Sequence, residues 1–297
     1  MNIPIRLALT TTLAALLPLA AHAQQATLDK IKESGSITLA YRESSIPFSY
    51  LDDKAQPVGF GVDICDKVVD EIKKATGRAD LKVQRQAVTS ANRIPLLVNG
   101  TIDLECGSTT NNSDRAKQVT FAVNYFYTGT RFLVKADSGI KSLADLNNKV
   151  MVSTTGTTNF RIMRGIISEQ KLPIELIAAK DHSESALLVE SGRAAAFAMD
   201  DILLYGLRAS AQNPASLAVV GDPIQVEPYA IMMRKDDAGI KKLVDGVLAG
   251  LMKSGEFERL YRKWFMSPIP PKGINLNAPM GKELTDNLKA LSDKPAT

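Results

Sequence analysis

The chain has 297 residues, a formal net charge of +4 at pH 7 and a hydrophobic content of 45%. This length is enough for two domains of ordinary size or one large domain. Its lysines and arginines are scattered among acidic residues without a basic run, which indicates a solvated surface and argues against a nucleic-acid-binding groove.

The first 23 residues have the pattern of a secretory signal peptide. Arg6 supplies a positive charge, 7–20 is rich in apolar residues, and 21–23 (Ala-His-Ala) has the small-x-small pattern of a cleavage site. The apolar run is shorter than the roughly 20 residues needed to span a bilayer, and Pro18 interrupts it, so an uncleaved anchor is the weaker alternative. No later segment has a membrane-spanning pattern. We therefore expect a soluble exported protein that begins near Gln24.

Short apolar runs alternate with amphipathic segments, which predicts an α/β fold with largely parallel sheets. Residues 42–50 are expected to form a loop, because Pro47 excludes a helix. In the first part of the chain, strands are predicted at 37–41, 81–86 and 102–106, and helices at 28–34, 59–74 and 92–99.

A second unit is expected after Gly129, and the tail after Pro268, rich in Pro, Gly and Asn, is expected to wrap the surface. Strands are predicted at 131–135, 150–153, 174–178, 195–199, 218–220 and 230–234. Helices are predicted at 143–146, 159–167, 183–191, 203–209, 240–254 and 256–265.

Cys65 and Cys106 allow either a disulfide in an oxidising compartment or two buried thiols. The thiols are the default, because the sequence does not give the Cα separation that decides between them. Without the leader, His182 is the only histidine, which excludes a multi-histidine metal site, and the cysteines lack zinc-finger spacing. We expect no metal and no cofactor.

Small hydroxyl residues and an arginine follow the apolar strand at 102–106. Ser108 and Thr110 offer hydroxyls beside free backbone N–H groups. Arg115, expected at the start of a helix, offers a planar fork of donors that fits a carboxylate with two parallel hydrogen bonds. This is chemistry that can hold an amino-acid backbone, and it requires no catalyst.

The second unit carries polar groups at equivalent places. Thr155 and Thr158 surround Gly156 at a strand-to-helix turn, where hydroxyls, N–H groups and the positive helix end suit a carboxylate. Asp200 follows another strand. Ligands of open α/β sheets bind beyond the carboxyl ends of strands, so two facing sets of ends would form a cleft. Each of these residues also has an ordinary explanation as a helix cap or surface ion pair.

Four motifs, in order along the chain, resemble the periplasmic solute-binding proteins of polar amino-acid ABC transporters. They lie at 99–121, 142–157, 188–200 and 255–265. The resemblance covers essentially the whole chain after the leader. It implies a two-lobed periplasmic-binding-protein fold of type II, with hinge strands near 129–135 and 227–234. The implied first lobe comprises 24–130 and 229–297, and the second lobe comprises 131–228.

Within that family, four segments are similar to the glutamate/aspartate-binding branch: 42–50, 92–97, 105–112 and 179–182. The resemblance implies that Arg115 holds the ligand α-carboxylate and that Asp200 pairs with the α-ammonium. Ser108 and Thr110 would complete the carboxylate grip or accept the ammonium.

The same branch resemblance implies that Arg42, Arg93 and a positively charged His182 hold a side-chain carboxylate. Three arginines and Asp200 give the site a charge of about +2 before His182 is counted, which complements glutamate or aspartate. A neutral ligand would leave a buried arginine unpaired at a cost of several kcal/mol.

The resemblance implies capture of an acidic amino acid by lobe closure, delivery to the membrane permease of an ABC transporter, and a monomer. Alternatives are a neutral or basic ligand, with Arg42 and Arg93 on the surface, or an amino-acid sensor. An enzyme is least favoured, because the chain has no Gly-x-Ser-x-Gly elbow. The sequence does not rank glutamate against aspartate, which differ by one methylene worth about 1 kcal/mol of burial.

Overall fold

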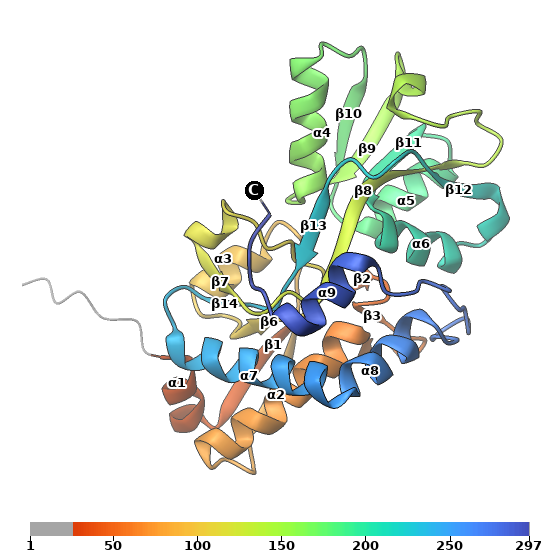
Figure 1. Ribbon diagram of the computed structural model, residues 1–297. Coiled ribbons are helices and arrows are strands. Elements are labelled where there is room, and N and C mark those ends of the chain that lie inside the picture. Colours follow the sequence, from red (N-terminus) through yellow and green to blue (C-terminus); the bar gives the residue numbers. More distant parts are fainter. Residues whose placement is uncertain (1–25, 297) are drawn as a thin grey trace, which may run out of the picture.

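The computed structural model describes residues 26–296, so the predicted signal peptide lies outside the described residues. The chain forms two lobes, each built on one mixed β-sheet flanked by helices (Figure 1). The predicted two-lobed α/β fold is confirmed. No helix in 26–296 is long and apolar enough to cross a membrane.

The sheet of the first lobe has the order β5-β1-β6-β14-β7. Its strands are β1 (Ser36–Tyr41), β5 (Lys82–Ala87), β6 (Leu104–Glu105), β7 (Val119–Phe121) and β14 (Met232–Arg234). Its helices are α1 (Thr27–Ser34), α2 (Phe60–Thr76), α3 (Arg93–Val98), η1 (Arg115–Lys117), α7 (Ala238–Ser254), α8 (Glu256–Phe265) and α9 (Lys282–Ala290).

The sheet of the second lobe has the order β10-β9-β11-β8-β12, and β13 also pairs with β8. Its strands are β8 (Phe126–Lys135), β9 (Val150–Thr154), β10 (Glu175–Ala179), β11 (Ala196–Asp200), β12 (Leu217–Val220) and β13 (Val226–Tyr229). Its helices are η2 (Leu143–Leu146), α4 (Thr158–Glu169), α5 (His182–Glu190), α6 (Asp201–Ser210) and η3 (Pro214–Ser216).

Helix periodicity in the sequence explains how the helices pack. In α8, Phe257, Leu260, Tyr261 and Trp264 are buried at the spacing that makes one apolar face. Gly255 separates α7 from α8 with φ of +78°, a backbone conformation that side chains other than glycine rarely adopt. Two amphipathic helices can therefore turn sharply and cover the same lobe.

Two strands connect the lobes. β8 and β13 run antiparallel to each other between the lobes (Figure 1), and β13 leads within three residues into β14 of the first sheet. Aromatic rings pack around this connection: Phe48 lies 4.8 Å from Phe126 and 5.1 Å from Tyr229 between ring centroids. The connecting strands are thus anchored against the core of the first lobe.

Several sequence predictions need correction. The sheets are mixed rather than largely parallel, because β14 and β8 return antiparallel to their neighbours after crossing between the lobes. The predicted loop at 42–50 contains the short strands β2 (Ser44–Ser45) and β3 (Ser49–Leu51), which pair with each other, and β3 also pairs with β4 (Pro57–Val58). The tail contains α9, whose buried Leu284 packs on the core.

The last described residues form a strap across the first lobe, which we call the C-terminal strap (292–296). Ala296 forms a bridge with Asn112, and its N–H donates to the carbonyl oxygen of Asn111 over 2.9 Å. The side-chain amide of Asn124 donates to the Lys294 carbonyl oxygen over 2.9 Å. The tail thus contacts the segment that follows β6.

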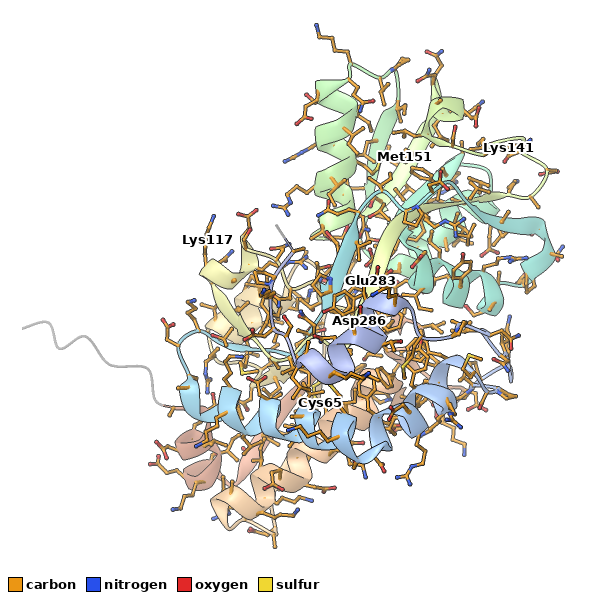
Figure 2. All side chains as sticks on the ribbon, in the orientation of Figure 1. Cys65, Lys117, Lys141, Met151, Glu283 and Asp286 are labelled. Carbon is orange, nitrogen blue, oxygen red and sulfur yellow. A yellow bond between two sulfur atoms is a disulfide. The ribbon has the colours of Figure 1, made fainter. Side chains whose placement is uncertain are left out.

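Cys65 on α2 and Cys106 after β6 form a disulfide, with their Cα atoms 6.1 Å apart. Of the two alternatives, the disulfide is therefore present and the two free thiols are not. Figure 2 labels Cys65 in the first lobe and the buried Met151 of β9 in the second. The disulfide ties α2 to the strand end from which the segment containing Ser108 begins.

Candidate functional site

A small cavity lies between the lobes. Its volume is about 10 Å³, which is room for about one water molecule. Seven of the nine predicted site residues line it, namely Arg93, Ser108, Thr110, Arg115, Thr158, His182 and Asp200. The remaining lining residues, which the sequence analysis did not select, are Ser90, Thr157, Asn159, Met199 and Leu203.

Arg115 lies at the start of η1 and joins the two lobes. Its Nη1 donates to the carbonyl oxygen of Thr110 over 3.0 Å, and its Nη2 donates to the Gly156 carbonyl oxygen in the second lobe over 3.1 Å. Burial, and next the charge of Arg93, lower the pKa of Arg115 to about 9, so the guanidinium is positive at neutral pH. A buried cation with its donors at the lobe interface can hold a carboxylate.

Arg42 does not line the cavity but lies fully buried behind His182. Its Nη2 is 3.3 Å from Nε2 of His182, and the other ring nitrogen, Nδ1, is 2.9 Å from Oγ1 of Thr154. A guanidinium only donates, so Nε2 must accept and the ring proton must be on Nδ1. Burial, and next the charge of Arg42, hold the pKa of His182 well below its ordinary value. The predicted imidazolium is therefore wrong, and His182 is a neutral imidazole.

Arg93 opens α3 and is 2% exposed. Its Nη1 is 3.9 Å from Oε1 of the fully buried Glu105, which is an ion pair without a hydrogen bond. Within 26–296, the Nε and Nη1 atoms of both Arg93 and Arg42 have no hydrogen-bond partner. Buried polar groups are normally satisfied, so these four N–H-bearing atoms are available for an acceptor.

Asp200 ends β11, and its carboxylate is surrounded by hydrogen-bond donors. Asn159 Nδ2 donates to Oδ1 over 2.7 Å, and the hydroxyl of Tyr229 donates to Oδ2. Burial, and next the charge of Glu227, raise the pKa of Asp200 to about 7. A nearby cation would favour the charged form of this carboxylate.

Two buried carboxylates were missed by the sequence analysis. Glu105 lies beside Arg93, and Glu227 accepts hydrogen bonds from Thr110 and Thr158 at the back of the cavity. With Asp200 ionised, three arginines face three carboxylates, so the formal charge is zero rather than the +2 that we predicted. The missing negative charges come from β6 and β13, where a single acidic residue in an apolar strand gives no sequence signal of a site.

Thr155 does not reach the cavity. It is exposed, and its N–H donates to the Ala179 carbonyl oxygen over 2.9 Å. Thr157 lines the cavity in its place, and its hydroxyl accepts from the N–H of Phe160 as the N-cap of α4. The prediction located the right turn and, in Thr158, a residue that lines the cavity, whereas Thr155 lies on the other side of Gly156, where φ of +79° reverses the chain.

Ser90 and Asn159 had partial signals in the sequence. Ser90 follows β5 by three residues, at a strand end of the kind that supplied the other candidates, and its buried Oγ has no hydrogen-bond partner among the described residues. Asn159, 1% exposed, stands in the first turn of α4 beside Thr158. Both could have been selected by also considering polar residues that lie up to one turn beyond each predicted strand end.

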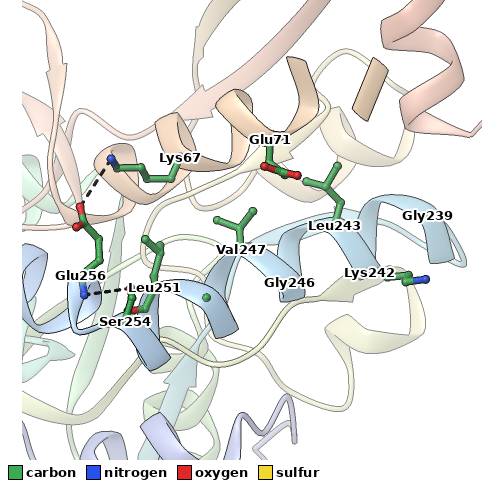
Figure 3. Close-up of a pocket in the computed structure, with 11 residues that line it drawn as sticks. Lys67, Glu71, Gly239, Lys242, Leu243, Gly246, Val247, Leu251, Ser254 and Glu256 are labelled. Carbon is green, nitrogen blue, oxygen red and sulfur yellow. Dashed lines mark hydrogen bonds and ion pairs between the residues drawn. The ribbon is translucent and has the colours of Figure 1, made fainter. Parts of the chain in front are cut away.

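A larger pocket lies away from this site. It is an open groove of about 830 Å³ between α2 and α7, lined by Leu243, Val247 and Leu251 together with Lys67 and Glu256 (Figure 3). The exposed Lys67 and the partly buried Glu256 form an ion pair at 3.7 Å. Residues 26–296 contain no group of three or more His, Cys, Asp or Glu residues that could hold a metal ion.

The model of the bacterial extracellular solute-binding proteins, family 3, matches residues 37–267. The chain is 48% identical over 299 residues to the L-glutamate/L-aspartate-binding protein of Pseudomonas aeruginosa, covering 100% of this chain and 99% of that protein. It is 47% identical to the glutamate/aspartate import solute-binding protein of Escherichia coli, covering 93% of this chain and 90% of that protein.

Among solved structures, the chain is similar to the ancestral amino acid-binding protein AncCDT-1, a precursor of cyclohexadienyl dehydratase. The TM-score is 0.67 at 27% identity, covering 81% of this chain and 99% of that one. The two sequence relatives are binding proteins rather than enzymes, whereas the fold also includes a forerunner of an enzyme.

Proposed function

The chain belongs to the bacterial extracellular solute-binding proteins of family 3, and from this membership we propose that it binds L-glutamate or L-aspartate in the periplasm. The bound amino acid is delivered to the permease of an ABC transporter for import. The names of the two sequence relatives support this ligand class. The leader, 1–23, is removed on export.

The observation that carries the proposal is the pair of buried guanidiniums with unpartnered donors. Arg42 and Arg93 are both at most 2% exposed, and Nε and Nη1 of each have no hydrogen-bond partner among the described residues. A buried donor without a partner costs about 1–3 kcal/mol, and a charged one costs more. A ligand side-chain carboxylate supplies the missing acceptors, whereas an apolar side chain would leave them unpaired.

The backbone groups of the ligand are assigned to the rest of the cavity. Arg115 holds the α-carboxylate, and Asp200, with Thr110 and Thr158, holds the α-ammonium. His182 acts as a neutral imidazole that orients Arg42. The charges fit this arrangement, because Arg115 is a buried cation and because burial, and next the charge of Glu227, raise the pKa of Asp200, an effect that a bound ammonium would offset.

Binding requires the lobes to move. A cavity of about 10 Å³ does not admit an amino acid, so the contact between Arg115 and the Gly156 carbonyl must open and close again around the ligand. β8 and β13 are the hinge strands of this motion. We place the lobe boundaries at 24–130 and 229–297 for the first lobe and at 131–228 for the second.

The function is binding without catalysis. His182, the histidine of the cavity, has both ring nitrogens engaged, with Arg42 on one side and Thr154 on the other. Ser108 donates its hydroxyl proton to Ser45 over 3.1 Å instead of to a base. The described cavity therefore lacks the nucleophile–base pair on which hydrolytic enzymes depend.

A neutral amino acid is the second candidate, and one observation favours it. The three arginines and three carboxylates of the site sum to zero formal charge, so a zwitterion such as glutamine keeps the site neutral. The two candidates differ in whether Arg42 and Arg93 meet a carboxylate or an amide oxygen.

Calorimetric titration of the ligand-stripped chain without residues 1–23 tests the proposal, using glutamate, aspartate, glutamine and arginine. Glutamate or aspartate should bind most tightly, and Arg93→Ala should weaken that acid about 100-fold or more. Arg164→Ala, an exposed arginine on α4, is the matched control and should leave binding unchanged. Tightest binding of glutamine supports the second candidate, and no binding of any of the four contradicts both.

A further inference from the structure

The carboxylate of Glu227 lies at the point where the hinge meets both lobes. Glu227 is in β13, opposite Thr128 in the pairing with β8, and is 1% exposed. The first lobe reaches the same strand, because Thr110 forms a bridge with Tyr229. The position of this carboxylate is therefore set by the backbone of the hinge.

One oxygen of Glu227 accepts a hydrogen bond from each lobe. Oγ1 of Thr110, in the first lobe, donates to Oε2 over 3.0 Å, and Oγ1 of Thr158, in the second lobe, donates to the same oxygen over 2.6 Å. The two hydroxyl oxygens are 3.4 Å apart. Both threonines line the cavity, whereas Glu227 stands behind them.

These contacts determine what the threonines offer to a ligand. A hydroxyl has one proton and two lone pairs, and both protons point at the carboxylate oxygen of Glu227. Only lone pairs then face the cavity, so both hydroxyls accept hydrogen bonds and neither donates one. Arg115, which has five N–H donors and no acceptor, offers the opposite. The cavity is thereby divided into a donor side and an acceptor side.

We propose that Glu227 is a positioning residue that makes the site specific for an α-ammonium group, by fixing the hydroxyls of Thr110 and Thr158 as acceptors. This inference rests on the proposed function, since it concerns how the same site recognises its amino acid. Glu227 acts through the two threonines and does not itself touch the ligand.

The test compares two ligands that differ only in the ammonium group. Glutarate has the two carboxylates of glutamate and no amino group, so its affinity does not depend on the acceptor side. In Glu227→Gln, the amide NH₂ in the position of Oε2 donates to the threonine hydroxyls and turns their protons toward the cavity. We expect glutamate to bind roughly ten- to a hundredfold more weakly, and glutarate, measured by competition, to change less than threefold.

Glu175→Gln, an exposed position on β10, is the matched control and should bind both ligands like the wild type. Equal weakening of glutamate and glutarate by Glu227→Gln, or no weakening of either, overturns the inference while leaving the proposed function intact. A wild-type chain that does not bind glutamate or aspartate overturns the proposed function itself, so the two failures are distinguishable.

A double-mutant cycle separates the hydroxyl route from a simple charge effect. Thr158→Val removes the hydroxyl while keeping the shape, and its effect on glutamate should add only in part to that of Glu227→Gln, because the two substitutions share one of the two threonine contacts of Glu227. Additive losses overturn the hydroxyl route. If Glu227→Gln does not fold, Thr158→Val alone is tested with both ligands. It should weaken the binding of glutamate and change that of glutarate less than threefold.

Discussion

Nη2 of Arg42 lies 3.3 Å from Nε2 of His182, and both side chains are buried from solvent. Because the arginine nitrogen is a donor in every protonation state that a protein allows, the histidine nitrogen is the acceptor. The sequence predicts that His182 is a cation that binds the side-chain carboxylate of the ligand. In the structure it is a neutral group that orients the cation Arg42.

His182 should therefore stay neutral over the physiological range. It is the only histidine after residue 23, so its ring signals are assigned without ambiguity. By NMR of the folded protein, these signals should not shift between pH 8 and pH 5, while the unfolded chain titrates near 6.5. A midpoint near 6.5 in the folded protein would contradict the neutral assignment.

The same depressed pKa has a consequence for stability. Below pH 6.5 the unfolded chain binds a proton that the folded chain does not, so the free energy of unfolding should fall as the pH drops, by up to about 1.4 kcal/mol per pH unit from this group. His182→Gln should remove this component between pH 6.5 and 5, as measured by urea unfolding.

Asp200 should link ligand binding to proton release. Burial, and next the charge of Glu227, raise its pKa to about 7, and an α-ammonium beside it stabilises the ionised form. Affinity for the amino acid should therefore fall as the pH drops below 7, by up to tenfold per pH unit. Calorimetry at pH 6 in buffers of different ionisation enthalpy should detect protons released on binding.

Asp200→Asn provides the control for that linkage. It removes the charge and the titrating group together, so affinity should fall about 100-fold at pH 8 and its remaining pH dependence below 7 should disappear. An Asp200→Asn variant that still shows the full pH dependence would assign the linkage to another group.

Thr155 and Thr157 form a matched pair on the two sides of Gly156. Thr155→Val changes an exposed side chain outside the cavity and should alter neither stability nor affinity. Thr157→Val removes the N-cap of α4 and should cost about 1 kcal/mol of unfolding free energy, with weaker ligand binding. Equal effects of the two substitutions would show that the turn is arranged differently around Gly156.

The disulfide between Cys65 and Cys106 should stabilise the first lobe considerably. It closes a loop across a sequence separation of 41, for which chain entropy predicts a contribution of about 4 kcal/mol. Replacing both cysteines by alanine should lower the denaturant midpoint by a corresponding amount. The wild type under reducing conditions should behave like this double variant, and a midpoint that does not move would contradict a structural role for the bond.

Much of the fold could be predicted because each main strand is a compact apolar run between turn residues. β1, β9 and β11 are of this kind, and their bounds differ by one residue at most from the prediction. The errors lie where local composition and tertiary structure disagree. α9 was missed because it follows a Pro-, Gly- and Asn-rich stretch, and its burial depends on contact with a core that is distant in sequence.

The site residues also divide into those that the local sequence predicts and those that depend on tertiary contacts. Ser108, Thr110 and Arg115 could be predicted because they are neighbours in one segment whose chemistry is visible together. Glu227 could not, since its role depends on two threonines at sequence separations of 117 and 69 that only the folded hinge brings to it. The charge prediction failed for this reason: a sum over selected residues omits those that only the fold reveals.

Residues 232–234 fill the gap between β6 and β7, so the sheet of the first lobe is completed from the far end of the chain. A polypeptide that crosses the membrane N-terminus first carries β1, β5, β6 and β7 across as an unfinished sheet. The strands of the second lobe follow one another in sequence from β8 to β13, so all of them have crossed before β14 does. The sheet of the first lobe can therefore be completed only after most of the polypeptide has crossed.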